Sequence, residues 1–593
     1  MKRKLLLSLL LLAFLTLTGC SDDEENLGDN QYNGSDYQYN EKVDIEKPEE
    51  ITVKEVETDF EMSSENGTYT QSGNIYKITT AGTYSLKGKL NGQILIEAGE
   101  DDEVELELNG VSISYDSDSA IKAVTGSKVE ISAKKDTDNI IKDTRNAKTT
   151  DIESQGEGAI SADMDLKLKG SGTLVVTGNY NNGVHTTKDL TIQKLTLKST
   201  GYNNGLKGKD SVTINSGNIQ SYALTGNGVK TSDSDVSSKG KQRGTIAING
   251  GTIYVDSLHD AIDASYNVTV DELDGEIPTK LTIKTGTNSS NYNKSTFKAD
   301  SEKGIKAANE IVINKGTIGI AASDDAIHAN YGDALESGEK GLGNVTVNDG
   351  NIRVASGDDG LHADNILNIA GGKIVVTGAT EGYEANYINI TGGYSYIYGT
   401  DDGVNCSKKS FKNCAFTMSG GYLDVAVRSG DTDGIDSNGD FTLSGGTIVT
   451  RGSPGLSGNR MSTGLDVDGT ISMTGGILIA FNGLEKSPSA SSLIKYAGTS
   501  SSNSSMGGGS GHGGFDKNSG SSSSVNLEAG NYKLSGDGID VSFINDYQYG
   551  SFMVYSGQLA DNATYTLYRN DSSILSWSQS SNSVTISTKW SKI

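Results

Sequence analysis

A repeat of about 22 residues constrains the fold of this chain more than any other feature. The tetrapeptide Tyr-Asn-Asn-Gly occurs at 180–183 and again at 202–205, and a small residue followed by an aliphatic or aromatic one keeps the same phase along much of the chain. The pairs are Ala120-Ile121, Ala159-Ile160, Gly183-Val184, Gly205-Leu206, Gly228-Val229, Ala261-Ile262, Gly304-Ile305, Ala326-Ile327, Gly360-Leu361, Gly382-Tyr383, Gly403-Val404, Gly434-Ile435 and Gly464-Leu465. Several intervals are 21 to 24 residues and the others are longer, as inserted loops would make them. A period in this range predicts a solenoid.

Short strands joined by bends account for one repeat. In ILNIAGGKIVV (366–376), Leu367 and Ile369 alternate with outward positions, and the same alternation resumes after Gly371-Gly372. The two glycines permit a bend that a Cβ atom would obstruct. No 3.6-residue periodicity separates the strands, so we expect no crossover helices. The pattern predicts an all-β parallel β-helix, whose coils stack about 4.8 Å apart around a column of aliphatic side chains.

The repeated amides have a structural interpretation. Asn181-Asn182 and Asn203-Asn204 fall on the same turn of adjacent coils. We expect their side-chain amides to form a ladder and assign them no catalytic role.

Composition divides the chain into five parts. A basic start, an apolar run (5–15) and a polar, acidic stretch precede the repeats, and a Ser/Gly-rich stretch follows them. The predicted parts are a signal peptide (1–19), an acidic tether (20–60), a β-helix (67–485), a flexible Ser/Gly-rich insertion (486–526) and a small C-terminal β segment (527–593).

The segment Leu17–Cys20 resembles the lipobox of bacterial lipoproteins. That resemblance implies cleavage before Cys20 and attachment of lipid to its thiol; an ordinary signal peptide is the alternative. The acidic run at 21–25 resembles a surface-export signal. We therefore expect a protein of the cell envelope, exposed outside the cytoplasm and held to the membrane through its lipid only.

Charge and cysteine content limit the partners. The net charge of −26 argues against nucleic acid, whose phosphates recruit Lys and Arg, and it favours cations or ligands held through cations. We expect a monomer. Cys406 and Cys414 lie in one predicted loop and either form a disulfide or stay as free thiols.

Two rows of outward residues flank the small-aliphatic pairs. The row just before each pair contains Asn182, Asn204, Asn227, Asp260, Lys303, Asp325, Asp359, Glu381, Asp402 and Asp433. The row just after each pair contains His185, Lys207, Lys230, Asp263, Lys306, His328, His362, Glu384, Asn405, Asp436 and Asp466. Carboxylates accumulate in the later coils.

Stacked carboxylates repel by roughly 1 kcal/mol per pair in water, so they require protons, basic neighbours or a bound cation. Oxygen ligands from several strands suit Ca²⁺. The alternative is that each Asp caps a turn. The predicted calcium ligands are Asp358, Asp359, Glu381, Glu384, Asp401, Asp402, Asp433 and Asp436.

Three tyrosines alternate in GGYSYIYG. Tyr394, Tyr396 and Tyr398 are predicted to share an outward face, with Ser395 and Ile397 directed into the core. Exposed rings on a flat sheet suit stacking on sugars, so we predict carbohydrate binding there. The alternative is the ordinary preference of strands for Tyr.

The segment 81–113, followed by recurring DGI, DGL and DAI turns, resembles a bacterial family of carbohydrate-binding β-helix proteins over about 67–485. The resemblance implies the pectate-lyase-like right-handed parallel β-helix, an association with calcium, and binding of cellulose and acidic plant polysaccharides.

Three functions follow from these patterns. The first is non-catalytic binding of acidic, polygalacturonate-like or cellulosic glycans. The second is a calcium-dependent polysaccharide lyase, for which Arg353, Arg428 and Arg451 are the candidate bases. The third is a structural surface adhesin without a glycan partner.

Overall fold

The computed structural model describes residues 47–150, 155–332, 335, 338–455, 462–489, 495–499 and 526–586. The predicted signal peptide and Cys20 lie outside the described residues, as does most of the predicted insertion. Within the described part, helical structure is confined to one 3-10 turn, η2 (Gly286–Asn288), and no helix is long and apolar enough to cross a membrane.

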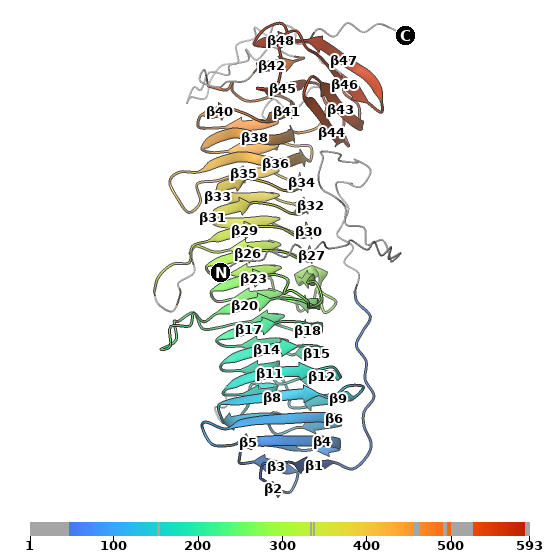
Figure 1. Cartoon of the computed structure of the whole chain (residues 1–593), viewed down its shortest axis with the longest axis vertical. Coiled ribbons are helices and arrows are strands. Elements are labelled where there is room, and N and C mark those ends of the chain that lie inside the picture. The colour runs from blue at the N-terminus through green and yellow to red at the C-terminus, as the bar shows by residue number, and fades with distance from the viewer. Residues whose placement is uncertain are drawn as a thin grey trace, which may run out of the picture.

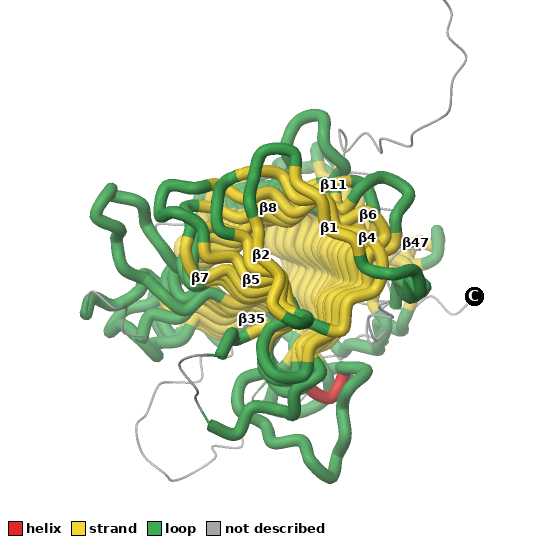
Figure 2. The backbone as a smooth tube through the Cα atoms, turned by 90° about the horizontal axis from the view of Figure 1, so that it is seen from below, coloured by secondary structure: helices red, strands yellow, loops and turns green. Residues whose placement is uncertain are grey.

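The described strands form coils stacked along one axis (Figure 1), and the view along that axis shows them as a ring (Figure 2). Through most of the stack each coil contributes three strands, and each strand pairs in parallel with the equivalent strand of the next coil, for example β10 with β13 and β13 with β16. The prediction of an all-β chain with parallel stacked coils is confirmed.

The strands fall into three rows along the stack. The first row contains β3 (Ile75–Ile78), β5 (Gln93–Glu97), β7 (Ile121–Thr125), β10 (Gly158–Ala162), β13 (Asn182–Thr186), β16 (Leu206–Gly208), β19 (Val229–Lys230), β22 (Ile262–Ala264), β25 (Ile305–Ala307), β28 (Ile327–Ala329), the starts of β31 (Leu361–Ile369) and β33 (Tyr383–Ile390), β35 (Val404–Cys406), β37 (Ile435–Ser437) and β39 (Leu465–Val467).

The second row contains the starts of β4 (Gly82–Asn91) and β6 (Glu103–Tyr115), β8 (Lys128–Ala133), β11 (Asp165–Gly170), β14 (Asp189–Gln193), β17 (Ser211–Ile214), β20 (Thr245–Ile248), β23 (Asn267–Val270), β26 (Glu310–Ile313), β29 (Asn344–Val347), the ends of β31 and β33, the starts of β36 (Ala415–Val427) and β38 (Asp440–Arg451), and β40 (Ile471–Met473).

The third row contains the ends of β4 and β6, β9 (Asp138–Asp143), β12 (Thr173–Gly178), β15 (Leu195–Gly201), β18 (Gly217–Ala223), β21 (Thr252–Ser257), β24 (Lys280–Thr285), β27 (Thr317–Ala321), β30 (Asn351–Ala355), β32 (Lys373–Ala379), β34 (Tyr394–Gly399), the ends of β36 and β38, and β41 (Ile477–Phe481).

Antiparallel strands close both ends. At the N-terminal end β1 (Glu61–Ser64) pairs with β4, and β2 (Tyr69–Ser72) pairs with β3. At the other end β45 (Phe552–Ser556) pairs antiparallel with β41 and β42 (Lys495–Gly498), and β48 (Ser583–Thr585) pairs with β42. A separate antiparallel sheet contains β43 (Gly530–Gly536), β44 (Ile539–Asn545), β46 (Thr564–Arg569) and β47 (Ser572–Ser578). These strands prevent the stack from presenting unpaired edges.

The small-aliphatic pair has a packing reason. The aliphatic member is buried in the central column, as at Val184 and Ile305, which are both fully buried. The small member of the pair lies very close to the next coil. A Cβ atom at Gly403, for example, would lie 2.0 Å from Val425 Cγ1. The Gly-Gly bend has a conformational reason. Gly372 has a φ of +80° and Gly393 a φ of +77°, a backbone conformation that favours glycine.

The part of the predicted tether that the structure describes lies along the outside of the stack (Figure 1). Gln220 Nε2 donates to the Glu49 carbonyl at 2.7 Å, and the Val56 N–H donates to Ser112 Oγ at 3.0 Å. Glu55 pairs with Lys142 at 2.6 Å. From residue 47 to the first strand the chain is therefore a docked strap, which the acidic composition alone did not predict.

Candidate functional site

Several of the residues that precede a small-aliphatic pair cap the following coil; we call the row of these residues the capping ladder. Asn182 Oδ1 accepts Asn204 Nδ2–H at 2.7 Å, and Asn204 Oδ1 accepts the Asn227 backbone N–H at 3.1 Å. The predicted amide ladder is confirmed for Asn182 and Asn204, whereas Asn181 donates to a Glu157 carboxylate oxygen.

Aspartates replace asparagines in this role farther along. Asp325 Oδ1 accepts the Asp359 N–H at 3.0 Å, Asp359 Oδ1 accepts the Glu381 N–H at 3.2 Å, and Asp402 Oδ1 accepts the Asp433 N–H at 2.7 Å. The capping interpretation is thus confirmed for these aspartates. Asparagine does the same work without charge, so capping does not account for the negative charge and the second oxygen of each aspartate.

The residue after each pair forms a second row, the outer ladder. The strand registers place His185 beside Lys207, Lys207 beside Lys230 and so on, through His328, His362 and Glu384 to Asp436 and Asp466. The predicted alignment of this row is confirmed. Its charge changes along the axis from mainly basic to acidic.

The two ladders meet in a cluster of two histidines and four carboxylates. We call it the histidine cluster; its members are Asp325, His328, Asp359, His362, Asp364 and Glu384. The imidazole rings are stacked, with centroids 4.1 Å apart and planes 8° from parallel. Asp325, Asp359 and Glu384 are at most 2 % exposed, so their charges are largely removed from water.

Partners in the cluster shift its pKa values strongly. Burial disfavours the imidazolium, but contacts with Asp325, Asp359 and Asp364 outweigh burial and raise the pKa of His362 to about 12. Burial would raise the pKa of Asp325, yet the two imidazoles hold it below its usual range. Burial and the nearby acids Glu381 and Glu384 raise the pKa of Asp359 to about 9.

Farther along, the aspartate ladder consists of Asp402, Asp433, Asp436 and Asp466. Burial and repulsion from neighbouring aspartates raise the pKa of Asp402 to about 8, that of Asp433 to about 6 and that of Asp436 to about 7. Carboxyl groups with such values retain protons that carboxyl groups in water would release. A bound cation would relieve the same repulsion.

The predicted calcium ligands separate into two sets. Asp358, Asp359 and Glu381 bring one oxygen each within 4.8 Å of one another, and Glu384 does so with Asp359 and His362. Among the described residues, Asp401, Asp402, Asp433 and Asp436 form no such group of three. Their carboxylates follow one another along the stack instead of converging.

Sequence reasoning missed Asp325, His328, His362 and Asp364 as candidate ligands. The available signal was a duplicated motif, since DAIH (325–328) and DGLH (359–362) occupy the same phase of adjacent coils. Asp364, two residues beyond the second motif, carried no pattern of its own.

The tyrosine prediction is wrong in one respect. Ser395 and Ile397 point into the core as expected, and the Tyr383 hydroxyl and Ser395 Oγ lie 2.8 Å apart. Tyr396 and Tyr398 are only 2 % and 5 % exposed, however, in a cluster with Val375 and Ala426. Of the three rings, only that of Tyr394 is partly exposed, so the three do not form an open stacking surface.

Arg451 is not available as a catalytic base. It is fully buried, pairs with Asp424, and donates from Nε to Asn545 Oδ1 at 2.6 Å and from Nη2 to the Ile544 carbonyl at 2.7 Å. Its contacts join β38 to the C-terminal sheet. Cys406 and Cys414 are free thiols, and Cys414 Sγ donates to the Cys406 carbonyl at 3.2 Å.

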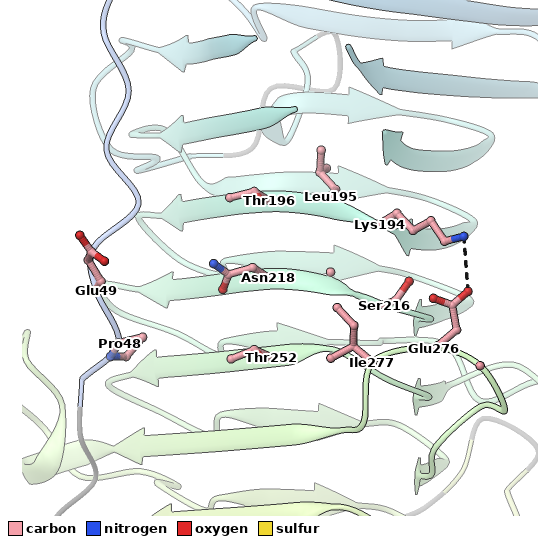
Figure 3. A pocket seen from close by; sticks show the side chains of 12 residues that line it. Pro48, Glu49, Lys194, Leu195, Thr196, Ser216, Asn218, Thr252, Glu276 and Ile277 are labelled. Atoms are coloured by element: carbon pink, nitrogen blue, oxygen red, sulfur yellow. Dashed lines mark ion pairs between the residues drawn. The ribbon is translucent and has the colours of Figure 1, made fainter. Parts of the chain in front are cut away.

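A groove of about 780 Å³ lies elsewhere, between the strap and the third row of strands (Figure 3). Pro48 and Glu49 form one side, and Thr196, Asn218 and Thr252 lie on the sheet. Lys194 and Glu276, 3.7 Å apart, form an ion pair at its end. The histidine cluster and the aspartate ladder take no part in this groove.

Parts of the chain are similar to known proteins. A family model described as "Carbohydrate-binding domain-containing protein" matches residues 72–341 and 330–454, more than half of the chain. A relative from Acetivibrio thermocellus, also described as a carbohydrate-binding domain-containing protein, is 31% identical over 196 residues, which are 32% of this chain and 62% of the relative. The chain thus aligns with less than two thirds of that relative.

One solved structure is also similar. It is described as the polysaccharide lyase-like protein from C. thermocellum, in a gadolinium derivative. It is 31% identical, covers 38% of this chain and 86% of its own, and superposes with a TM-score of 0.34. On the strength of the family match, the chain belongs to the carbohydrate-binding domain-containing proteins.

Proposed function

We propose that this protein is a non-catalytic polysaccharide-binding protein of the cell envelope, and that it recognises acidic, polygalacturonate-like or cellulosic glycans. The observation that carries the proposal is the line of buried and half-buried carboxylates on the two ladders, in a chain of the carbohydrate-binding domain family. Capping needs only an amide at these positions, as Asn182 and Asn204 demonstrate. The additional charge therefore serves a purpose other than capping.

Calcium is the cation that we assign to the carboxylates. The raised pKa values of Asp402, Asp433 and Asp436 measure how unfavourable their ionised forms are without a cation. Ca²⁺ accepts six to eight oxygen ligands in flexible geometry. Because the aspartates do not converge on one point, the protein leaves coordination positions for oxygens of a ligand.

A uronate chain can supply those oxygens. Both the protein and a polyuronate are anionic and repel each other, so a calcium ion between their carboxylates would convert repulsion into attraction. Successive coils repeat about every 4.8 Å, and many weak contacts along one chain would add through avidity. Sugar stacking on the tyrosine face stays a prediction, limited in this conformation to Tyr394.

We further propose that the ring of strands winds as a right-handed parallel β-helix and that lipid on Cys20 anchors it. The strap then gives the chain its path from anchor to stack. Carbohydrate chains outside the cytoplasm would be within reach of a protein held in this way.

The test is retention on insoluble polygalacturonate and on cellulose, with and without EDTA. We expect wild-type protein to bind polygalacturonate in millimolar calcium and to lose most of that binding in EDTA, since the cation bridges two anions. Asp402→Asn with Asp433→Asn keeps both caps and should weaken calcium-dependent binding.

A matched control removes two charges away from the ladders. Glu100→Gln with Asp101→Asn changes two exposed residues of a turn and should leave binding unchanged. Failure of wild-type protein to bind either polymer would contradict the proposal. Accumulation of unsaturated sugar products would instead establish a lyase.

A further inference from the structure

The duplicated DAIH and DGLH motifs build a site whose chemistry differs from that of the aspartate ladder. His328 on β28 lies beside His362 on β31, and each ring faces an aspartate three residues earlier in its own coil. His328 Nδ1 is 2.7 Å from Asp325 Oδ2, and His362 Nδ1 is 2.9 Å from Asp359 Oδ2.

Asp364 fixes the other edge of both rings. Its Oδ1 lies 3.2 Å from His328 Nε2 and 3.3 Å from His362 Nε2, while its Oδ2 accepts the Tyr331 N–H at 2.7 Å. A carboxylate in this position accepts the Nε2–H of each ring and so leaves the lone pair on Nδ1. Metal-binding histidines commonly have a carboxylate behind them in this way.

The Nδ1 atoms then have no adequate partner within the described part of the chain. Both are buried, and neither makes a hydrogen bond of acceptable geometry despite the carboxylate oxygen nearby. A nitrogen lone pair and a carboxylate lone pair at 2.7–2.9 Å repel unless a proton or a metal ion lies between them. Two ligands about 2.1 Å from one tetrahedral metal ion are about 3.4 Å apart, so each ring and its aspartate would separate by roughly half an ångström to admit an ion.

We propose that the histidine cluster binds one divalent transition metal ion of the zinc type. His328 Nδ1 and His362 Nδ1 are the nitrogen ligands, Asp325 and Asp359 supply oxygens, and Asp364 is a positioning residue behind both rings. Asp325, His328 and His362 each offer a ligand atom within 4.8 Å of the others. Ligands of a tetrahedral ion are about 3.4 Å apart, so small side-chain movements would complete the site.

Charge favours a dication at this place. The carboxyl groups of Asp325, Asp359, Asp364 and Glu384 meet here, and Lys303 and Lys409 contact Asp325 and Glu384 at 2.5 and 2.6 Å. The carboxyl groups outnumber these lysines, and a divalent ion would neutralise the negative charges that remain when they ionise. Protonation of both imidazoles would neutralise them too, and the experiment below distinguishes the two.

The nitrogen and oxygen ligand atoms of the cluster favour a transition metal ion over calcium. Ca²⁺ takes oxygen ligands, whereas imidazole nitrogen suits zinc, cobalt, nickel and copper. The site shares no ligand with the aspartate ladder, so its failure would leave the calcium proposed for that ladder intact. Its ligands come from adjacent coils, so the ion would hold the coil of β28 to the coil of β31.

The experiment uses the mature chain without a histidine tag, stripped with chelator and dialysed into buffer with millimolar calcium. We expect calorimetry to show one Zn²⁺ per chain. Co²⁺ should give visible absorption bands of a mixed nitrogen and oxygen ligand set. His328→Gln with His362→Gln should abolish both signals, and Asp364→Asn should weaken zinc about 10- to 100-fold.

Two controls keep the outcome interpretable. His259→Gln removes a histidine outside the cluster, and Asp402→Asn with Asp433→Asn removes two carboxylates of the aspartate ladder. Both variants should still bind one zinc ion. Circular dichroism checks that each variant is folded. Absence of zinc uptake by wild-type protein in calcium, or unchanged uptake in the double histidine variant, would overturn the proposal and leave the imidazolium form.

Discussion

Asp402 and Asp433 each cap the next coil with one carboxylate oxygen, and each is destabilised in its ionised form by burial and by neighbouring aspartates. One oxygen of Asp402 accepts the Asp433 N–H, and one oxygen of Asp433 accepts the Thr463 N–H. Asn182 and Asn204 fill the same positions of earlier coils without a charge. At the scale of the residue, Asp402 and Asp433 therefore carry a charge that the capping hydrogen bonds do not require.

The pH dependence of stability follows from these residues. The folded pKa values of Asp402 (about 8) and Asp433 (about 6) lie above the roughly 3.9 of an unfolded Asp, so the folded state binds protons that the unfolded state releases. Without metal, we expect the free energy of unfolding to fall as pH rises from about 4 to about 8. Asp402→Asn with Asp433→Asn should flatten this fall.

Thermal unfolding from pH 4 to 9 in chelator measures the effect. At pH 8 the variant should be more stable than wild type by on the order of 1–2 kcal/mol, because a repelling pair of buried charges is gone. Glu100→Gln with Asp101→Asn is the control for net charge. An equally steep slope in wild type and the Asn variant would contradict the assignment.

At the scale of the element, the small residue before each strand of the first row determines how closely coils stack. A Cβ atom at Gly403 would lie 2.0 Å from Val425 Cγ1 and 2.7 Å from the Gly434 carbonyl oxygen, whereas one at Gly319 would meet nothing within 4 Å. The two glycines thus differ in what surrounds them, although both belong to the stack.

This difference gives a matched pair of substitutions. Gly403→Ala should destabilise the protein by about 1–3 kcal/mol, because the added methyl group overpacks the contact between coils. Gly319→Ala, in strand β27, should be neutral or slightly stabilising. Urea unfolding followed by circular dichroism compares the two, and equal effects would show that coil spacing tolerates a side chain at the first position.

At the scale of the whole molecule, a few buried contacts join the stack to its C-terminal sheet. Arg451 lies against the rings of Phe481 and Phe543, pairs with Asp424 and donates hydrogen bonds to two residues of the C-terminal part. The Tyr422 hydroxyl adds a bond to the Ser542 carbonyl at 3.2 Å. These contacts place the C-terminal sheet against the last coils (Figure 1).

Arg451→Met should loosen this junction. The substitution removes the guanidinium from the buried Asp424 carboxylate, and breaking a buried ion pair in this way costs about 3–5 kcal/mol in comparable cases. Limited proteolysis should then release the C-terminal sheet while the stack persists. Adding Asp424→Asn removes the stranded charge and should restore part of the resistance; unchanged digestion of the single variant would show that other contacts carry the junction.

The sequence by itself determined the stack and the register of its ladders. The spacing of small-aliphatic pairs fixes which residues lie on the same line, because parallel coils repeat every side-chain direction. Asn182 above Asn204 and His328 beside His362 follow directly from that phase. The period of the repeat can be read directly from the sequence, and it is sufficient to predict which residues align on adjacent coils.

Only the tertiary structure decided which side chains surround each row of residues. Tyr396 and Tyr398 alternate as exposed residues would, yet they are buried in a cluster that Tyr547 contacts from about 150 residues later. Asp364 completes the histidine cluster without belonging to either ladder. Burial and the convergence of ligands depend on segments that are distant in sequence, and the repeat does not encode their positions. The sequence therefore predicted the rows, whereas the tertiary structure determined which side chains of those rows come into contact.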